Sequence, residues 1–326
     1  MGDVLTGIHA TWEFESDSVL IRFERGIRTP KLFQALGARG ERRIPHQALE
    51  SVTLTPGKRG TVVLHAAPRA GADPLAEAAA GQLRESVDPY RLVLPAERES
   101  LAAYFADELR SALSRDRLLR REDPAERYLV AAPEPPLHFK AYDGKASFDG
   151  ERVLFRWFWT GASSAKWKAG DQNIPVADLQ GVEWRSPDLF DGYLRLLRRD
   201  GASGTDRTEC TDRTHGGQDR QHGRHGTDGR HGTDGAARAD HDPAAVVFGL
   251  GYGPVHESLP FAAAVLEAVQ GTSGSRAAVP VPALAAARRD PADVADSIRH
   301  LGELHEAGLV TDEEFTAKKA ELLEEL

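Results

Sequence analysis

Six side chains with metal-binding chemistry gather in one glycine-rich tract, and they are Cys210, His215, His222, His225, His231 and His241. Thiolate and imidazole groups bind zinc, nickel and copper. The spacing lacks the paired Cys-x-x-Cys or His-x-x-x-His pattern of a closed zinc site, and the tract lacks the apolar residues that would surround a metal. We therefore interpret the tract as a passive linker and expect no metal and no cofactor. The alternative is weak metal binding through His215, His222, His225 and His231.

A glycine run, Gly249, Gly251 and Gly253, follows an expected strand and precedes an expected helix. Backbone amides at a helix N-terminus bind anions in many proteins. The dinucleotide fingerprint, however, is G-x-G-x-x-G within a βαβ unit that opens a domain. This run closes a domain instead, so we interpret it as a plain strand-to-helix turn.

An aromatic row forms a third candidate. Phe155, Trp157 and Trp159 alternate along one expected strand and would face the same side. Trp167 and Trp184 add to the aromatic content of this region. Packing in the core is our interpretation, and an exposed patch for a peptide or ligand is the alternative.

The sequence contains none of the common catalytic motifs. His256-Glu257 and His305-Glu306 both lack the second histidine of H-E-x-x-H, and neither G-x-S-x-G nor a Walker motif occurs. The lone Cys210 lies in the low-complexity tract, where a preorganised nucleophile has no support. We expect a protein that is not an enzyme, with a hydrolase or metal-dependent enzyme as the alternative.

The overall composition narrows the function further. The chain has 326 residues, which predicts two domains or slightly more. Its net charge of −9 argues against nucleic-acid binding and against an anionic membrane surface. One cysteine, no signal-peptide pattern and no long apolar run predict a cytoplasmic protein.

An internal repeat is the clearest feature that positions these residues. Residues 12–23 read WEFESDSVLIRF and residues 146–157 read ASFDGERVLFRW, an offset of 134 positions. Residues 44–52 and 174–182 both fit I-P-x-x-x-L-x-x-V, at an offset of 130 positions. Two similar segments in the same order predict a duplicated domain.

Short β-rich runs separated by Gly, Pro and Asp predict antiparallel hairpins in both copies. The expected strands are Val19–Phe23, Leu49–Leu54, Thr61–His65 and Arg91–Leu94, then Val153–Trp159, Leu179–Trp184, Tyr193–Leu197 and Ala245–Leu250. Apolar residues at helical spacing then predict one closing helix per copy, around Leu101 to Leu113 and Phe261 to Val269. Each copy is expected to be an α+β unit of six or seven strands, a small antiparallel barrel or sandwich closed by a C-terminal helix, which is similar to a PH-like domain.

The last residues, from Asp293 to Leu326, predict a two-helix hairpin. Gly308 ends the first helix, and Thr311 and Glu314 form a capping box for the second. Two helices this short leave apolar surface uncovered, so we expect the hairpin to bind another protein or a second copy of the chain, with docking on its own domain as the alternative. The expected contact residues are Ile298, Leu301, Leu304, Leu309, Phe315, Leu322 and Leu323.

The run G-L-V-T-D-E-E-F-x-x-K-K at residues 308–319 resembles the SHOCT domain, a short C-terminal domain of many bacterial proteins. The I-P-x-x-x-L-x-x-V element and the order of the repeat resemble the actinobacterial family of domain of unknown function 4429. The resemblance implies tandem PH-like units with an interaction or oligomerisation tail. We expect PH-like units at 1–116 and 137–270, linkers at 117–136 and 271–292, a disordered insertion at 200–241 and the hairpin at 293–326.

These observations favour a bacterial interaction or assembly module that is not an enzyme. Its expected partner is another protein or a second copy of the chain, bound through the hairpin. The alternative function is binding of a ligand or a lipid headgroup by one of the PH-like units.

Overall fold

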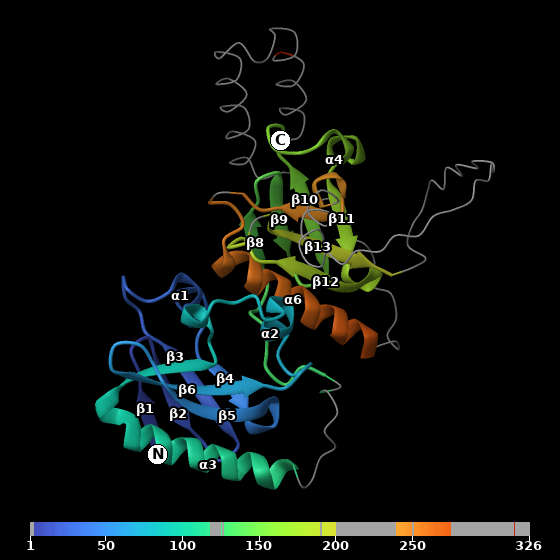
Figure 1. Ribbon diagram of the computed structural model, residues 1–326. Helices are drawn as coiled ribbons and strands as arrows, with labels where there is room; N and C mark the ends of the chain where they lie inside the picture. The colour runs from blue at the N-terminus through green and yellow to red at the C-terminus, as the bar shows by residue number, and fades with distance from the viewer. Residues whose placement is uncertain are drawn as a thin grey trace, which may run out of the picture. The chain divides into compact units, whose positions relative to one another are not determined.

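The computed structural model describes residues 3–117, 125, 127–189, 191–199, 239–249, 251–274 and 316. Residues Met1–Arg276 form one compact unit and Ala277–Leu326 form a second. The first unit consists of two halves with the same succession of elements (Figure 1). We call them repeat 1, residues 3–117, and repeat 2, residues 137–274.

Repeat 1 contains seven strands in two antiparallel sheets. A four-stranded sheet has the order β1-β2-β3-β4 and a three-stranded sheet has the order β5-β6-β7. The strands are β1 (Asp3–Thr6), β2 (Ala10–Phe14), β3 (Ser18–Phe23), β4 (Arg42–Pro45), β5 (Leu49–Pro56), β6 (Thr61–Pro68) and β7 (Arg91–Pro95). The helices are α1 (Lys31–Gly37), α2 (Pro74–Ala79) and α3 (Glu99–Arg117).

Repeat 2 repeats this topology, with sheets β11-β10-β9-β8 and β12-β13-β14. Its strands are β8 (Leu137–Lys140), β9 (Gly144–Phe148), β10 (Arg152–Trp157), β11 (Gln172–Pro175), β12 (Leu179–Arg185), β13 (Tyr193–Arg198) and β14 (Ala245–Val247), and its helices are α4 (Ser164–Ala169) and α6 (Val255–Gly274). The expected class, α+β with antiparallel sheets, is confirmed. None of these sheets closes into a barrel among the residues that the structure describes.

The turns of the two repeats match bond for bond. The Glu24 amide donates to the His9 carbonyl, and Phe158, 134 positions later, donates to Asp143 at the same distance of 2.9 Å. The Arg69 amide donates to Ala48 at 2.8 Å, and Arg199 donates to Asp178 at 2.9 Å, 130 positions later. The two offsets seen in the sequence are therefore backbone correspondences, and the duplication is confirmed.

Each closing helix buries the corresponding five positions against its own sheets, and nine of these ten side chains are apolar. In α3 these positions are Ala102, Phe105, Ala106, Leu109 and Leu113, and in α6, 156 positions later, they are Ser258, Phe261, Ala262, Val265 and Val269. All ten side chains are buried. This spacing places one face of each helix on the core, as an amphipathic helix requires.

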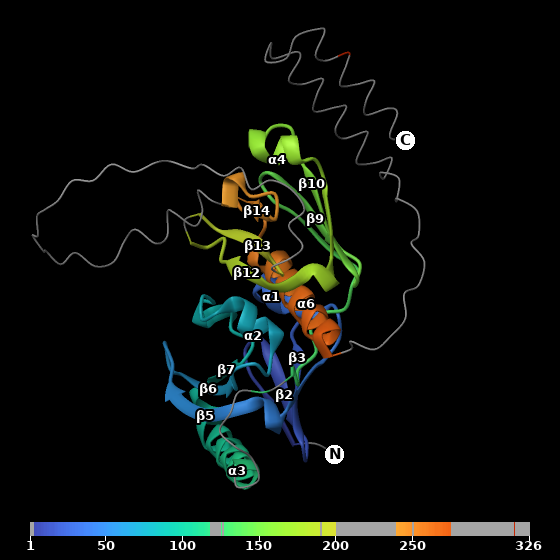
Figure 2. The same ribbon diagram turned by 90° about the vertical axis from the view of Figure 1, so that its right-hand side faces the viewer.

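The opposite faces of the two helices differ. Helix α3 exposes Asp107, Glu108 and Arg110. Helix α6 instead buries Leu259 and Ala263, and it packs against α2 and α1 of repeat 1 as well as against its own β12 (Figure 2). Helix α6 is therefore buried on two sides and joins the repeats.

Polar contacts hold the two repeats together beside α6. The Gln82 side chain donates to the Trp184 carbonyl at 3.1 Å and accepts from the Ser186 amide at 2.9 Å. The Gln270 side chain of α6 accepts from the amide of Tyr128, in the segment that connects the repeats, at 2.7 Å. These bonds use both polar atoms of the Gln82 amide across the contact between the repeats.

Three sequence expectations need correction. Strand β10 ends at Trp157 rather than Trp159, because the chain turns at Phe158, whose amide bonds to Asp143. Strand β14 ends at Val247 rather than Leu250, because the glycine turn begins there. Strand β6 continues to Pro68 rather than ending at His65, and helix α2 then begins after Asp73, whose side chain accepts from the Leu75 amide at 3.0 Å.

The expected domain boundaries stay predictions. The segment at 200–241 that we expect to be disordered lies outside the described residues except for its last three, and the expected linker at 271–292 except for its first four. Among the described residues, no helix is long and apolar enough to span a membrane.

Candidate functional site

A pocket opens where the two repeats meet, and we call it the inter-repeat pocket. Its volume is about 890 Å³. Repeat 1 contributes Lys31 and Leu32 of α1 together with Val87. Repeat 2 contributes the remaining lining residues, which are Tyr142, Pro187, Asp188, Leu189, Asp191, Gly192, Asp240, Val247, Phe248, Gly249, Gly251, Tyr252, Pro254, Val255 and His256.

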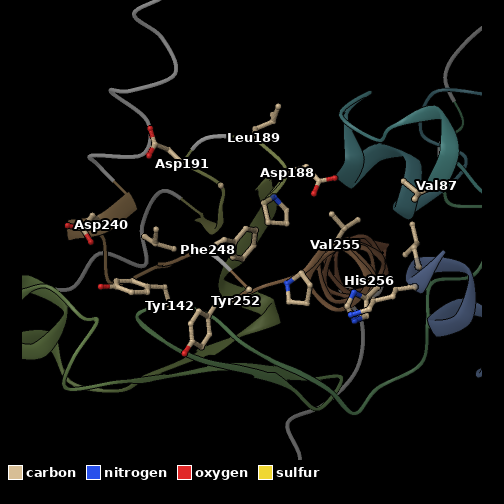
Figure 3. A pocket seen from close by; sticks show the side chains of 18 residues that line it. Val87, Tyr142, Asp188, Leu189, Asp191, Asp240, Phe248, Tyr252, Val255 and His256 are labelled. Carbon is tan, nitrogen blue, oxygen red and sulfur yellow. The ribbon is translucent and has the colours of Figure 1, made fainter. Parts of the chain in front are cut away.

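The two ends of the pocket differ in chemistry (Figure 3). At one end Tyr142 and Tyr252 meet edge to face, with ring centroids 6.3 Å apart, and Asp240 lies near Tyr142. Both rings remain about half exposed, at 52% and 45%. Aromatic rings that stay open to solvent beside a pocket are available for a ligand.

The other end carries His256 near Val87 (Figure 3). Partial burial lowers the pKa of His256, Lys31 lowers it further, and the neighbouring Glu257 acts in the opposite direction. The imidazole is therefore neutral at pH 7. Lys31 then supplies the positive charge at this end.

The glycine turn shapes the floor of the pocket. Gly251 and Gly253 have φ values of +83° and +63°, which side chains rarely adopt. A Cβ atom on Gly253 would lie 2.2 Å from the Phe248 ring. Because Gly253 also donates its amide to the Lys140 carbonyl at 2.7 Å, the interpretation as a strand-to-helix turn agrees with the geometry.

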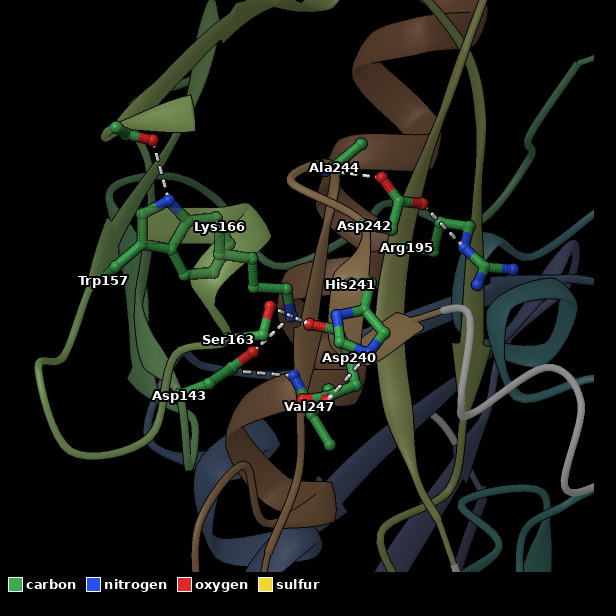
Figure 4. A network of polar contacts seen from close by, with 11 residues as sticks. Asp143, Trp157, Ser163, Lys166, Arg195, Asp240, His241, Asp242, Ala244 and Val247 are labelled. Atoms are coloured by element: carbon green, nitrogen blue, oxygen red, sulfur yellow. Dashed lines mark hydrogen bonds and ion pairs between the residues drawn. The ribbon is translucent and has the colours of Figure 1, made fainter. Parts of the chain in front are cut away.

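A buried ion pair is hydrogen-bonded to Val247, one of the residues that line the pocket (Figure 4). Lys166 pairs with Asp143, and both side chains are fully buried. Asp143 also accepts from the Val247 amide at 2.9 Å, and the Lys166 ammonium lies 5.1 Å from the centre of the Trp157 ring. Burial raises the pKa of Asp143, while Lys166 partly offsets this effect. The pair therefore anchors Val247, which lines the pocket.

The aromatic row of the sequence separates into buried and exposed side chains. Phe155 and Trp157 are buried, as the core interpretation expected. Trp159 lies beyond the end of β10 and is 50% exposed, and it packs edge to face against Trp167 at 5.2 Å. Trp184 is buried and donates to the Ser258 hydroxyl at 3.1 Å. The prediction that Phe155, Trp157 and Trp159 face the same side of one strand is therefore wrong.

Most of the predicted site residues lie outside the described part of the chain. This holds for the histidines His215, His222, His225 and His231 and for the hairpin residues Ile298, Leu301, Leu304, Leu309, Phe315, Leu322 and Leu323. Among the described residues, no group of three or more His, Cys, Asp and Glu side chains is placed to hold a metal ion.

Sequence reasoning missed the tyrosines and the buried pair. Tyr142, Tyr252 and the carboxylates come from loops far apart in the chain, so no local pattern unites them. The one available signal was the glycine run, which marks the turn that carries Tyr252. Lys166 and Asp143 are 23 positions apart, and the sequence does not indicate that they meet.

The class defined by these observations is a duplicated α+β protein whose repeats share one joining helix. The chain belongs to the family described as domain of unknown function (DUF4429), whose model matches residues 12–110 and 146–266. A second model, the short C-terminal domain SHOCT, matches residues 296–323. Both resemblances seen in the sequence are confirmed. Among curated proteins, none matches the chain.

Proposed function

We propose that this protein is a non-enzymatic interaction and assembly module, in which two PH-like repeats form a platform and the hairpin at residues 293–326 joins it to a second copy of the chain. The observation that carries the proposal is the apolar pattern of Ile298, Leu301 and Leu304, within a segment that the SHOCT model matches. A hairpin of this length does not bury such a stripe on its own.

The architecture of the repeats supports the PH-like part of the proposal. Each repeat has seven antiparallel strands in two sheets, followed by one helix whose apolar face covers the core. The joining helix α6 packs on both repeats, so the platform presents its surfaces at a fixed separation. We also place the module in the cytoplasm, because a chain with one cysteine, Cys210, forms no intramolecular disulfide.

Light scattering of the full-length protein tests the assembly role. We expect the wild type to have at least twice the mass of the monomer, and a Leu301→Glu, Leu304→Glu variant to be monomeric, because the added charges oppose burial of the stripe. A Lys319→Ala variant, changed at a charged position of the same segment, should keep the larger mass. Equal monomeric masses for all three proteins would overturn self-assembly, including in the case where the hairpin docks on its own chain.

A second candidate function is ligand binding in the inter-repeat pocket. The observation that favours it is the pair of half-exposed tyrosines in a pocket of about 890 Å³, a size typical of ligand sites. An anionic lipid headgroup fits poorly, because Asp188, Asp191 and Asp240 also line this pocket. Sedimentation with vesicles of phosphatidylcholine and phosphatidylserine tests the headgroup, and co-sedimentation that Tyr142→Ala abolishes would support it.

A further inference from the structure

The charges of the inter-repeat pocket are unevenly distributed. Three carboxylates line it, from Asp188, Asp191 and Asp240, against the single ammonium group of Lys31 among the described lining residues. Asp188 is paired with Arg84 at 3.2 Å. The Asp240 carboxylate lies 3.9 Å from Nε2 of His241. Asp191 and Asp240 give negative charge to the end where Tyr142 lies, opposite the end with His256 (Figure 3).

The tyrosines add a second feature that favours a cation. The ring faces of Tyr142 and Tyr252 carry negative electrostatic potential, which attracts an ammonium or guanidinium group. A guanidinium is planar, stacks on aromatic rings and pairs with carboxylates through two parallel hydrogen bonds. Among cationic side chains, arginine matches this combination of rings and carboxylates best.

Repeat 1 shows how the corresponding place is filled when the glycine turn is missing. There the strand-to-helix turn reads Pro95-Ala96-Glu97-Arg98, and the Arg98 guanidinium donates to the Thr6 carbonyl at 2.8 Å. The corresponding carbonyl of repeat 2, at Lys140, accepts instead from the amide of Gly253. Repeat 1 thus places its own guanidinium beside this turn, whereas in repeat 2 the side chain is absent and tyrosines line the space.

We propose that the inter-repeat pocket binds an extended peptide segment of a partner protein, with an arginine of that segment lying against Tyr142 and Tyr252 and facing Asp191 and Asp240. The pocket is larger than one arginine side chain, and away from the tyrosines it is also lined by Leu32, Val87 and Val255. These residues suit apolar side chains that flank the arginine. The proposal rests on the ligand-binding candidate above and names its ligand.

Degenerate nonapeptides with one fixed central residue test the proposal on the full-length protein. Four fluorescent pools carry arginine, lysine, citrulline or glutamate at the centre and equal mixtures elsewhere. Citrulline keeps the shape of arginine without its charge. We expect the arginine pool to bind best by fluorescence anisotropy, and the citrulline pool to bind about fivefold more weakly, as expected for loss of one cation–π and carboxylate contact at a half-exposed site.

Variants then locate the binding. Tyr142→Ala and Asp191→Asn should each weaken binding of the arginine pool about fivefold. Tyr104→Ala, a control at a tyrosine of α3 that is 53% exposed outside the pocket, should leave binding unchanged. Thermal melts of each variant show whether it is folded, and the conservative Asp191→Asn keeps the test valid if Tyr142→Ala unfolds.

Three results would overturn the proposal. They are equal binding of the arginine and citrulline pools, no binding of any pool, and binding that both pocket variants leave intact. Since these measurements do not involve the hairpin, their failure is distinguishable from failure of the assembly role, which light scattering reports. In the second of these cases, loss of vesicle binding in Tyr142→Ala would assign the pocket to a membrane surface instead.

Discussion

The two repeats have the same backbone fold, but one core position is stabilised by different interactions in each. In repeat 1, Phe33 of α1 stacks on Phe23 of β3 with ring centroids 4.9 Å apart. In repeat 2 the corresponding residues are Lys166 and Trp157, where the ammonium lies against the indole and pairs with buried Asp143. A lysine thus replaces a core phenylalanine because its charge has a partner and its stem an aromatic surface.

The closing helices also differ between the repeats, on the face that points away from the core. Helices α3 and α6 bury the same inward stripe, yet the outward position of Asp107 in α3 corresponds to Ala263 in α6. The inward face is determined by the fold of each repeat, whereas the outward face is determined by what it meets. A polar outer face at one end of a repeat array prevents further stacking, as in the capping units of solenoids.

The largest expected effect comes from breaking the buried pair of repeat 2. Lys166→Met leaves Asp143 buried without its cation and should lower the free energy of unfolding by about 3–5 kcal/mol. Chemical denaturation of the full-length protein measures the loss. The matched change in repeat 1, Phe33→Met, conserves an apolar side chain and should cost less than about 1.5 kcal/mol.

A double variant separates charge from packing at the same place. Lys166→Phe combined with Asp143→Asn imitates the phenylalanine of repeat 1 and keeps an acceptor for the Val247 amide. We expect it to recover more than half of the stability that Lys166→Met loses. A double variant that is as unstable as Lys166→Met would show that the pair is needed for more than charge compensation.

The next largest effect should follow from introducing, on the buried outer face of α6, the charged residue that α3 has at the corresponding position. Ala263→Asp places a carboxylate in the buried contact between the repeats and should cost about 2–3 kcal/mol. The reciprocal change, Asp107→Ala on exposed α3, removes a surface pair with Arg110 and should cost less than about 0.5 kcal/mol. Similar losses in the two variants, measured by denaturation, would contradict the assigned difference between the helices.

A smaller effect is expected from the side-chain clamp between the repeats. Gln82→Ala removes two hydrogen bonds across the contact, with Trp184 and Ser186, and should cost about 1–2 kcal/mol. Arg84→Ala removes only an exposed pair with Asp188 and should cost less than about 0.5 kcal/mol. Hydrogen exchange at the Ser186 amide is the direct readout, and unchanged protection in Gln82→Ala would refute the clamp.

The smallest effect concerns pH. Burial raises the pKa of Glu267 on α6, at a position where α3 has exposed Ser111. A carboxyl with a raised folded pKa favours the folded state most below its unfolded pKa, and this contribution is lost as the pH rises through the folded pKa. Glu267→Gln should therefore be more stable than the wild type at pH 7 by a few tenths of a kcal/mol, because solvent screens the half-buried group.

Denaturation of both proteins from pH 4 to pH 7 measures this difference. The Gln side chain can still accept from the Ala132 amide, which bonds to Glu267 at 3.3 Å, so the comparison isolates the charge. A wild type that gains stability relative to Glu267→Gln as the pH rises would reverse the sign and refute the assignment.

The duplication could be predicted from the sequence because the residues that reveal it have the same structural role in both repeats. Ile44 and Ile174 are buried in the core as the penultimate residues of β4 and β11, and the proline that follows each of them is the N-cap of the same 3₁₀ turn. The spacing of the two motifs therefore follows from the backbone. The closing helices were also predictable, since their inward residues repeat with helical period.

The contact between the repeats was not predicted, although α6 carried a signal for it. Leu259 and Ala263 extend the apolar surface of α6 beyond one stripe, which is typical of a helix buried on several sides. The pocket depends on this contact, because Lys31 and Leu32 reach it only when repeat 1 packs on α6. A site assembled from tertiary contacts leaves no spacing in the sequence to detect.

The burial of α6 on two sides also gives the chain an order of events during synthesis. Repeat 1 leaves the ribosome first with α3 in place and a polar outer surface on that helix, so its own core is complete. Its α1 and α2 remain uncovered while more than a hundred further residues are synthesised, until α6, the last element of repeat 2, emerges and packs on them. The duplicated protein is thus complete only when its last strand and helix arrive, and a truncated nascent chain would expose the waiting surface to chaperones.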